Sequence, residues 1–164
     1  MEEPEASSNW YETARQDIAD PVFTSFRWNG RTTDWFLQEL VSGVNRFPEA
    51  RMNLTLFTVS GILSGTLISA EEYFRIFADN FCRGFDADET TDGIRNYYAS
   101  LGTPPPKAEP EADEPIGEAP PQYIHLKDAK HFSPGGVIPN NEGLLWRGTI
   151  ASISGFTLGQ LQKG

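Results

Sequence analysis

Two histidines are the first side chains to weigh for metal chemistry. His125 and His131 stand six residues apart in one segment, with Asp128 as the carboxylate between them. A zinc site needs about four nitrogen, sulfur or oxygen ligands. Because this segment offers too few, we expect no metal and no other cofactor. We assign His125 to the surface or to an edge strand.

Nucleophiles and acid–base pairs are equally sparse. Cys82 precedes Arg83 at the expected end of a helix, where the helix dipole disfavours a thiolate, so we interpret it as a structural cysteine. Glu71 and Glu72 are adjacent on a helix and point in different directions. No nucleophile, base and orienting group can be assembled, and phosphate-loop and dinucleotide motifs are absent. We therefore expect no catalytic residue and no enzyme activity.

Arg147 precedes Gly148 between two short apolar runs. Its guanidinium can hold an anion, or it can donate hydrogen bonds to backbone carbonyls at a corner of a bent sheet. We favour the corner role.

Aromatic side chains are the candidates for contact with a partner or a second copy. Tyr73 and Phe77 belong to a helical stripe that forms either a core face or a docking face, and Trp146 follows an apolar run. Trp10 and Tyr11 are the apolar spot of a polar arm, and they dock either on their own fold or on a partner. Together with Arg147, these five aromatic residues are our candidate interaction residues.

The spacing of apolar residues predicts the elements that position these side chains. Helices are expected over 34–47, from Ser69 to about Cys82, and over 92–101. A hairpin is expected over 53–69, with a turn at Ser60-Gly61 and a bend or close backbone approach at Gly65. Alternation over 123–127, the turn-rich stretch 133–143, and apolar runs at 144–146, 150–153 and 156–161 predict further short strands.

Charge is distributed unevenly along the 164 residues, whose formal net charge is −10. Residues 1–20 carry a net −5 and 71–122 a net −8, while 21–70 and 123–164 carry +1 and +2. Without a basic stripe, nucleic-acid binding has little electrostatic support. No apolar run is long enough for a membrane span, and no signal-peptide pattern starts the chain. We expect a cytoplasmic protein.

The domain organisation follows from these patterns. We expect a disordered acidic arm over 1–20 and a single domain over 21–164. A helical insertion over 70–102 and a Pro/acid-rich disordered connector over 103–121 interrupt that domain between its second and third strands.

A helix followed by five short, bent strands resembles the Sm-like barrel. The order of Ser60-Gly61, Gly65-Thr66-Leu67, His125 to Ala129, and Arg147-Gly148 carries this resemblance. It implies an α+β fold: a small, bent, five-stranded antiparallel sheet or barrel with an N-terminal helix and an acidic helical insertion. An RNA-binding ring protein is the alternative function that it implies.

A second resemblance covers about Asn53 to Leu161. The runs NLTLFTVSGILSGTLISAEEYF, YIHLKDAK and WRGTIASISGFTLG are similar to the gas vesicle accessory protein GvpU family. This resemblance implies a non-enzymatic, gas-vesicle-associated protein that acts in vesicle assembly or clustering. It implies the gas vesicle shell or other assembly proteins as partners, together with homo-oligomerisation.

Overall fold

The computed structural model describes residues 33–103, 120–133, 135–139 and 141–161. The chain divides into two units, 1–33 and 34–164, and every element described below belongs to the second. The expected arm, with Trp10 and Tyr11, and most of the expected connector lie outside the described residues.

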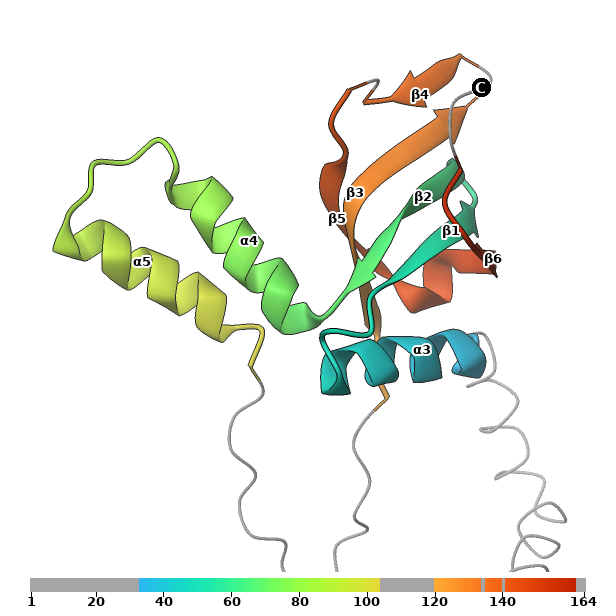
Figure 1. Cartoon of the computed structure of the whole chain (residues 1–164), viewed down its shortest axis with the longest axis horizontal. Helices are drawn as coiled ribbons and strands as arrows, with labels where there is room; N and C mark the ends of the chain where they lie inside the picture. Colours follow the sequence, from blue (N-terminus) through green and yellow to red (C-terminus); the bar gives the residue numbers. More distant parts are fainter. Residues whose placement is uncertain (1–32, 104–119, 134, 140, 162–164) are drawn as a thin grey trace, which may run out of the picture. The chain divides into compact units, whose positions relative to one another are not determined.

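The described elements form an α+β fold with a helix before the first strand and a helical insertion after the second, as the sequence predicts (Figure 1). The elements, in chain order, are α3 (Trp35–Arg46), β1 (Met52–Thr58), β2 (Gly61–Ile68), α4 (Ala70–Cys82), α5 (Glu89–Ser100), β3 (Tyr123–Ser133), β4 (Gly136–Ile138), β5 (Leu144–Thr149), the 3₁₀ turn η2 (Ile150–Ser152) and β6 (Ile153–Leu158).

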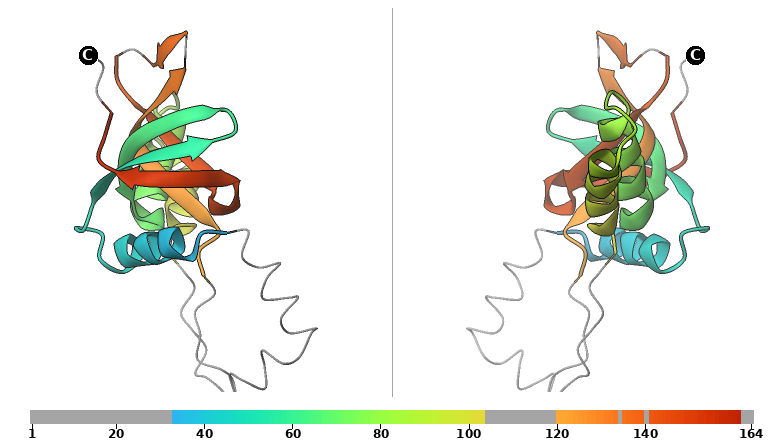
Figure 2. Two further views of the ribbon diagram at one scale, coloured as in Figure 1. Left: turned by 90° about the vertical axis from the view of Figure 1, so that its right-hand side faces the viewer. Right: turned by 90° about the vertical axis from the view of Figure 1, so that its left-hand side faces the viewer.

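The strands form one antiparallel sheet in the order β4-β3-β2-β1-β6, with β5 also paired to β3. The long strand β3 has two partners on one side. Its first part, from Tyr123 to Ala129, pairs with β5, and its end, from His131 to Ser133, pairs with β4. The sheet is strongly curved, and β6 crosses beside β1 in Figure 2.

The sequence predicts five strands, whereas the described residues form six. The sheet is not closed into a barrel, since β5 and β6 do not pair. The additional strand, β4, has three residues within the Pro/Gly/Asn-rich stretch. So short a strand shows no alternation that sequence patterning can detect.

A bulge bends β3 where it passes β2. The register shifts between Ser64 and Thr66, and Asp128 on β3 adopts a φ of 53°. A Cβ at Gly65 would lie 3.0 Å from both the Ala129 Cα and the Lys127 carbonyl oxygen. The close backbone approach predicted at Gly65 is confirmed, and it lets the two strands stay paired through the bend.

Two local predictions were wrong. The hairpin turn consists of Val59 and Ser60, because Gly61 already pairs with Thr58 as the first residue of β2. The run from Ile150 is a 3₁₀ turn rather than a strand. This turn carries the chain from β5, beside β3, to β6, beside β1, and its Ile150 side chain is fully buried.

Side-chain caps set the start of each described helix. Asp34 accepts from the backbone N–H groups of Phe36 and Leu37, and Ser69 accepts from that of Glu72, as predicted. The third helix starts earlier than predicted, at Glu89, because Asp88 caps it through the Thr91 N–H.

An aliphatic core lies between α3 and the concave side of the sheet. α3 contributes Leu37, Val41 and Val44, each of which is at most 1% exposed. The sheet and η2 supply the remainder: Leu54, Leu56, Leu63, Leu67, Ile124, Leu126, Ala129, Ile150 and Ile153.

Candidate partner-binding surface

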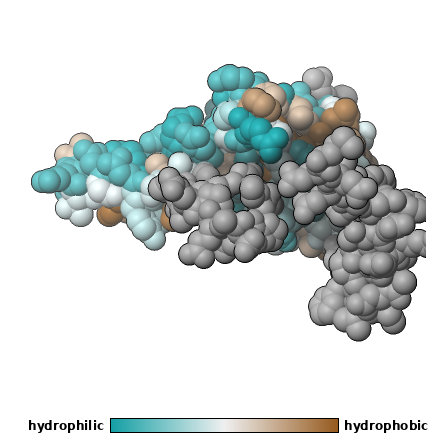
Figure 3. Space-filling model, turned by 90° about the horizontal axis from the view of Figure 1, so that it is seen from below, coloured by the Kyte–Doolittle hydropathy of each residue, from teal (hydrophilic) through white to brown (hydrophobic). Residues whose placement is uncertain are grey.

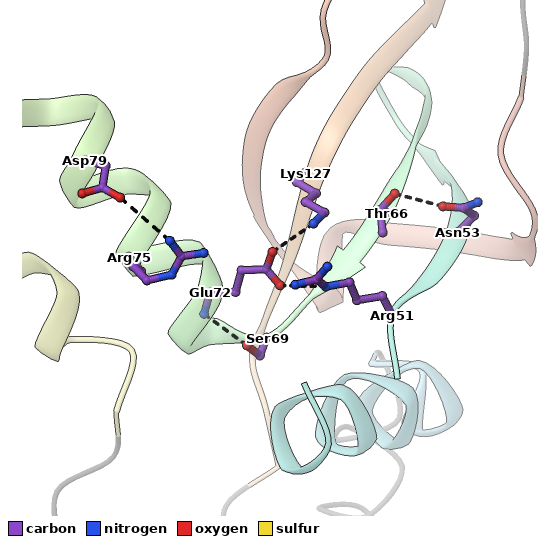
Figure 4. A network of polar contacts seen from close by, with 8 residues as sticks. All are labelled: Arg51, Asn53, Thr66, Ser69, Glu72, Arg75, Asp79 and Lys127. Atoms are coloured by element: carbon purple, nitrogen blue, oxygen red, sulfur yellow. Dashed lines mark hydrogen bonds and ion pairs between the residues drawn. The ribbon is translucent and has the colours of Figure 1, made fainter. Parts of the chain in front are cut away.

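A buried carboxylate joins the first turn of α4 to the sheet. Glu72 is 8% exposed, and its Oε1 accepts from Lys127 Nζ on β3 at 2.9 Å (Figure 4). Its Oε2 accepts from Arg51 Nε at 3.1 Å, just before β1. Both carboxylate oxygens are thus engaged in ion pairs. They hold the first turn of α4 against β3 and the start of β1.

His125 occupies the junction between α4 and the sheet. The expected surface or edge role was wrong: its side chain is 4% exposed, and β3 has β2 and β5 on its two sides. The Tyr73 ring covers it at a centroid distance of 4.6 Å, and Phe74 lies at 6.1 Å. Burial, and then the charge of Arg147, lower the pKa of His125 from 6.5 to about 4. His125 is therefore neutral near pH 7.

Arg147 lies opposite His125 in the β3–β5 register. Its Nε donates to His125 Nε2 at 3.3 Å, so the imidazole proton resides on Nδ1. The guanidinium carbon lies 3.6 Å from the centroid of the Tyr123 ring and 6.0 Å from that of Phe74. These contacts differ from the expected corner role, because Arg147 donates to a side chain and stacks on a ring. The exposed guanidinium is thus held in one position.

An aromatic ladder continues from this cluster along α4. Tyr73, Phe77, Phe81 and Phe85 follow at four-residue spacing, with successive centroids 6.3, 6.0 and 5.5 Å apart. Tyr98 of α5 joins it at 5.4 Å from Phe77 and 4.9 Å from Phe81. Burial raises the pKa of Tyr73, against the opposing effect of Arg147.

Comparison with known proteins places this arrangement in a family. Residues 34–161 match the GvpU-like family, described as gas vesicle protein GvpU-like. The chain belongs to the GvpU-like family. The match begins at the Asp34 cap of α3 and ends just beyond β6, so it includes both the sheet and the helical insertion. No curated protein and no solved structure matches the chain.

The GvpU-like fold brings three of the predicted interaction residues to one side of the molecule. Tyr73, Phe77 and Arg147 all belong to the cluster and ladder around His125. Trp146 instead packs against the core, with its ring across Gly148. Trp10 and Tyr11 lie outside the described residues.

Sequence reasoning missed Tyr123, whose exposed ring supports Arg147. In the printed sequence, Tyr123 reads as the outward residue of an alternating strand. Its distance of 24 positions from Arg147 offers no local signal, since only the β3–β5 register brings the two together.

This GvpU-like protein shows no metal centre in the part of the chain that the structure describes: no three His, Cys, Asp or Glu side chains gather there. None of its described helices combines the length and apolar character needed to cross a membrane. The family is one of gas vesicle proteins and is not known for enzymes.

Proposed function

We propose that this GvpU-like protein is a non-enzymatic accessory factor in gas vesicle assembly or clustering. It acts through contacts with the vesicle shell or other assembly proteins and through self-association. The family match over residues 34–161 carries the proposal.

The Arg147 surface supports a binding role. An exposed guanidinium normally loses side-chain freedom when it meets a partner. Arg147 is already held by Tyr123 and His125, so much of that cost is met in the free protein. Tyr73, Phe77 and Tyr123 add the rigid aromatic area typical of binding hot spots.

The charge pattern supports self-association as the second part of the proposal. The sequence of 104–119 contains five acidic residues and one lysine. Such a segment complements a cationic group like Arg147 on a neighbouring copy, through many weak contacts. Self-association of this type weakens as salt screens the charges.

A flotation experiment tests vesicle contact directly. Purified protein is mixed with isolated gas vesicles, and the vesicles are floated by centrifugation. We expect the protein to rise with the buoyant layer and the vesicles to cluster, and we expect both effects to fall in high salt. Protein that stays in solution, with vesicles that remain dispersed, contradicts the proposal.

Two matched variants locate the contact. Arg147→Gln removes the charge and should lower the bound fraction several-fold, with a smaller loss for Tyr73→Ala. Val59→Ala is the control, since Val59 is a fully exposed apolar residue in the β1–β2 turn. Equal binding by all three variants would place the contact elsewhere, and Trp10→Ala then tests the N-terminal segment.

Binding to RNA is the alternative implied by the resemblance to the Sm-like barrel. The exposed guanidinium on an aromatic ring is the observation that favours it, since both groups stack on bases. A gel-shift assay with uridine-rich RNA at low salt decides the matter. We expect no shift, whereas a shift lost in Arg147→Gln would favour the ring-protein function.

A further inference from the structure

A groove opens on the α4–α5 hairpin, at the end of the aromatic ladder farther from Arg147. Its volume is about 520 Å³, within the range of sites that hold several apolar groups. It is lined by Phe81, Phe85, Thr90, Gly93, Ile94, Tyr97 and Tyr98. Three of these rings remain well exposed: Phe81 at 44%, Phe85 at 49% and Tyr97 at 62%.

The groove is accessible because α5 is covered on one side alone. Among the described elements, α5 packs extensively on α4 and on no other. Figure 3, seen from below, shows a hairpin surface that is mostly hydrophilic, with few hydrophobic side chains. On the face seen in Figure 3, the hairpin is therefore mostly polar.

Gly93 forms part of the groove wall in the interior of α5, and nothing in its own fold requires a glycine there. A Cβ at this position would meet no atom within 4 Å, and its φ is not positive. Glycine inside a helix lowers stability relative to alanine. Its absent side chain leaves the helix backbone open to close approach.

Two acidic residues are chain neighbours of residues that line this groove. Glu89, Gly93 and Tyr97 follow at four-residue spacing and so share one row along α5. Asp86 directly follows Phe85. Among the described residues, neither Asp86 nor Glu89 forms an ion pair, in contrast to Asp79 and Asp92, which pair with Arg95.

From these observations we infer that the groove binds an amphipathic helix of another protein, with an apolar face in the groove and Lys or Arg beside Asp86 and Glu89. The apolar face meets the exposed rings, and a small apolar side chain approaches the Gly93 backbone. This mode is the docking of a helix in a groove, with the cationic flank setting its orientation.

The charge of the hairpin disfavours a second hairpin as the occupant. Residues 70–102 contain seven acidic and three basic residues, a net charge of −4. Two such grooves facing each other would bring like charges together. A basic helix gains from the same charges, and its binding weakens as salt is added.

The probe is a synthetic 18-residue Leu/Lys peptide, with leucines at helical i, i+3, i+4 spacing. Its binding to the full-length protein is measured by calorimetry at two salt concentrations. Two comparison peptides are a scrambled sequence of the same composition and a helix in which glutamate replaces lysine. We expect the designed helix to bind at least tenfold more tightly than either. Equal affinity of the scrambled peptide would show that binding is non-specific charge attraction, and it would overturn the inference.

Substitutions at Gly93 separate the groove from the fold. Gly93→Leu places a side chain in the groove and should weaken peptide binding at least tenfold. Gly93→Ala should raise the unfolding midpoint of the hairpin while weakening binding less. Gly43→Leu in α3 is the matched control: its Cβ also meets open space, and Gly43 does not line the groove. Gly43→Leu should bind as the unmodified chain does.

Removal of the acidic charges beside the groove provides an independent test. The double variant Asp86→Asn, Glu89→Gln should weaken binding about threefold to tenfold and reduce the salt dependence. Unchanged peptide affinity in both Gly93→Leu and this double variant overturns the inference. Flotation of Gly93→Leu with vesicles tests the proposed role in vesicle assembly separately. Failure of the groove inference therefore leaves that role untouched. Self-association that is lost in Gly93→Leu, without peptide binding in the unmodified chain, would assign the groove to a second copy.

Discussion

The sheet with α3 and the α4–α5 hairpin bury different kinds of side chain. Beneath the sheet, leucine, isoleucine and valine residues are almost completely buried, as in an ordinary globular core. In the hairpin, the buried residues are Glu72, Ala78 and Cys82 of α4 and Thr91 of α5, while the large aromatic rings stay partly exposed.

From this difference we expect the stability of the chain and its contacts with partners to depend on different regions. Burial of aliphatic area provides most of the free energy of folding, so the sheet and α3 should dominate stability. The hairpin is attached through polar contacts at Glu72 and through aromatic contacts at His125. Its exposed rings can therefore serve as contact surface without loss of the core. Four experiments test this division, in order of decreasing effect on stability.

The largest effect is expected in the aliphatic core. Leu126→Ala removes a fully buried side chain and should lower the free energy of unfolding by about 3 kcal/mol. Tyr97→Ala, in the exposed groove of the hairpin, should change it by less than about 0.5 kcal/mol. Urea unfolding of both variants makes the comparison. Similar losses would show that the hairpin contributes to stability as the sheet does.

Acid should destabilise the protein through His125. Its pKa is about 4 when folded, against 6.5 in the unfolded chain, so the unfolded state takes up the proton first as the pH falls. The contribution of His125 to stability should decline from about pH 6.5 to pH 4 and then level off, a total loss of roughly 3 kcal/mol from this residue.

Unfolding at pH 7 and pH 4, compared between the unmodified chain and His125→Gln, isolates that contribution. The variant should lose less stability over this interval, although carboxylates titrate in both proteins. NMR titration of the imidazole gives the pKa directly. A value near 6.5 would mean that the Tyr73 and Arg147 contacts are not maintained in solution.

An intermediate effect is expected at the attachment of the hairpin. Glu72→Gln leaves Lys127 and Arg51 without their shared carboxylate and should cost about 1–2 kcal/mol, since both cations retain partial access to water. Asp79→Asn is the control, because the ion pairs of Asp79 are exposed and should contribute less than about 0.5 kcal/mol. Hydrogen exchange should rise in α4 for Glu72→Gln and not for Asp79→Asn.

The smallest effect on stability is expected from the acidic segment 104–119. Replacing Glu109, Glu111, Asp113, Glu114 and Glu118 with their amides should change the free energy of unfolding by less than about 0.5 kcal/mol. Sedimentation at low and high salt should show self-association that has become less sensitive to salt. An unchanged salt dependence would remove this segment from the proposed self-association.

Local sequence signals predicted the elements well where a specific side chain marks an end. Asp34 and Ser69 cap their helices as predicted. Prediction failed for the three-residue strand β4 and for the 3₁₀ turn at Ile150. Each has three residues, fewer than the run of about four to eight over which alternation can be recognised.

Local sequence signals likewise predicted only part of the candidate site. The four-residue spacing of Tyr73 and Phe77 shows that they share a helix face, and Arg147 stands out as a cation beside a glycine. Nothing local shows that this helix face meets Arg147, because the two come from segments more than 60 positions apart. Nor does the sequence show the groove around Gly93, which exists because α5 folds back on α4.

The sequence by itself determined the α+β class, the helical insertion, the uneven charge and the resemblance to gas vesicle accessory proteins. These properties depend on local spacing, composition and motif order. Tertiary structure alone decided that His125 is buried, that Tyr123 supports Arg147, and that Glu72 forms ion pairs with β3 and the start of β1. Strand register and the docking of α4 determine those contacts, and both depend on long-range packing that no local pattern encodes.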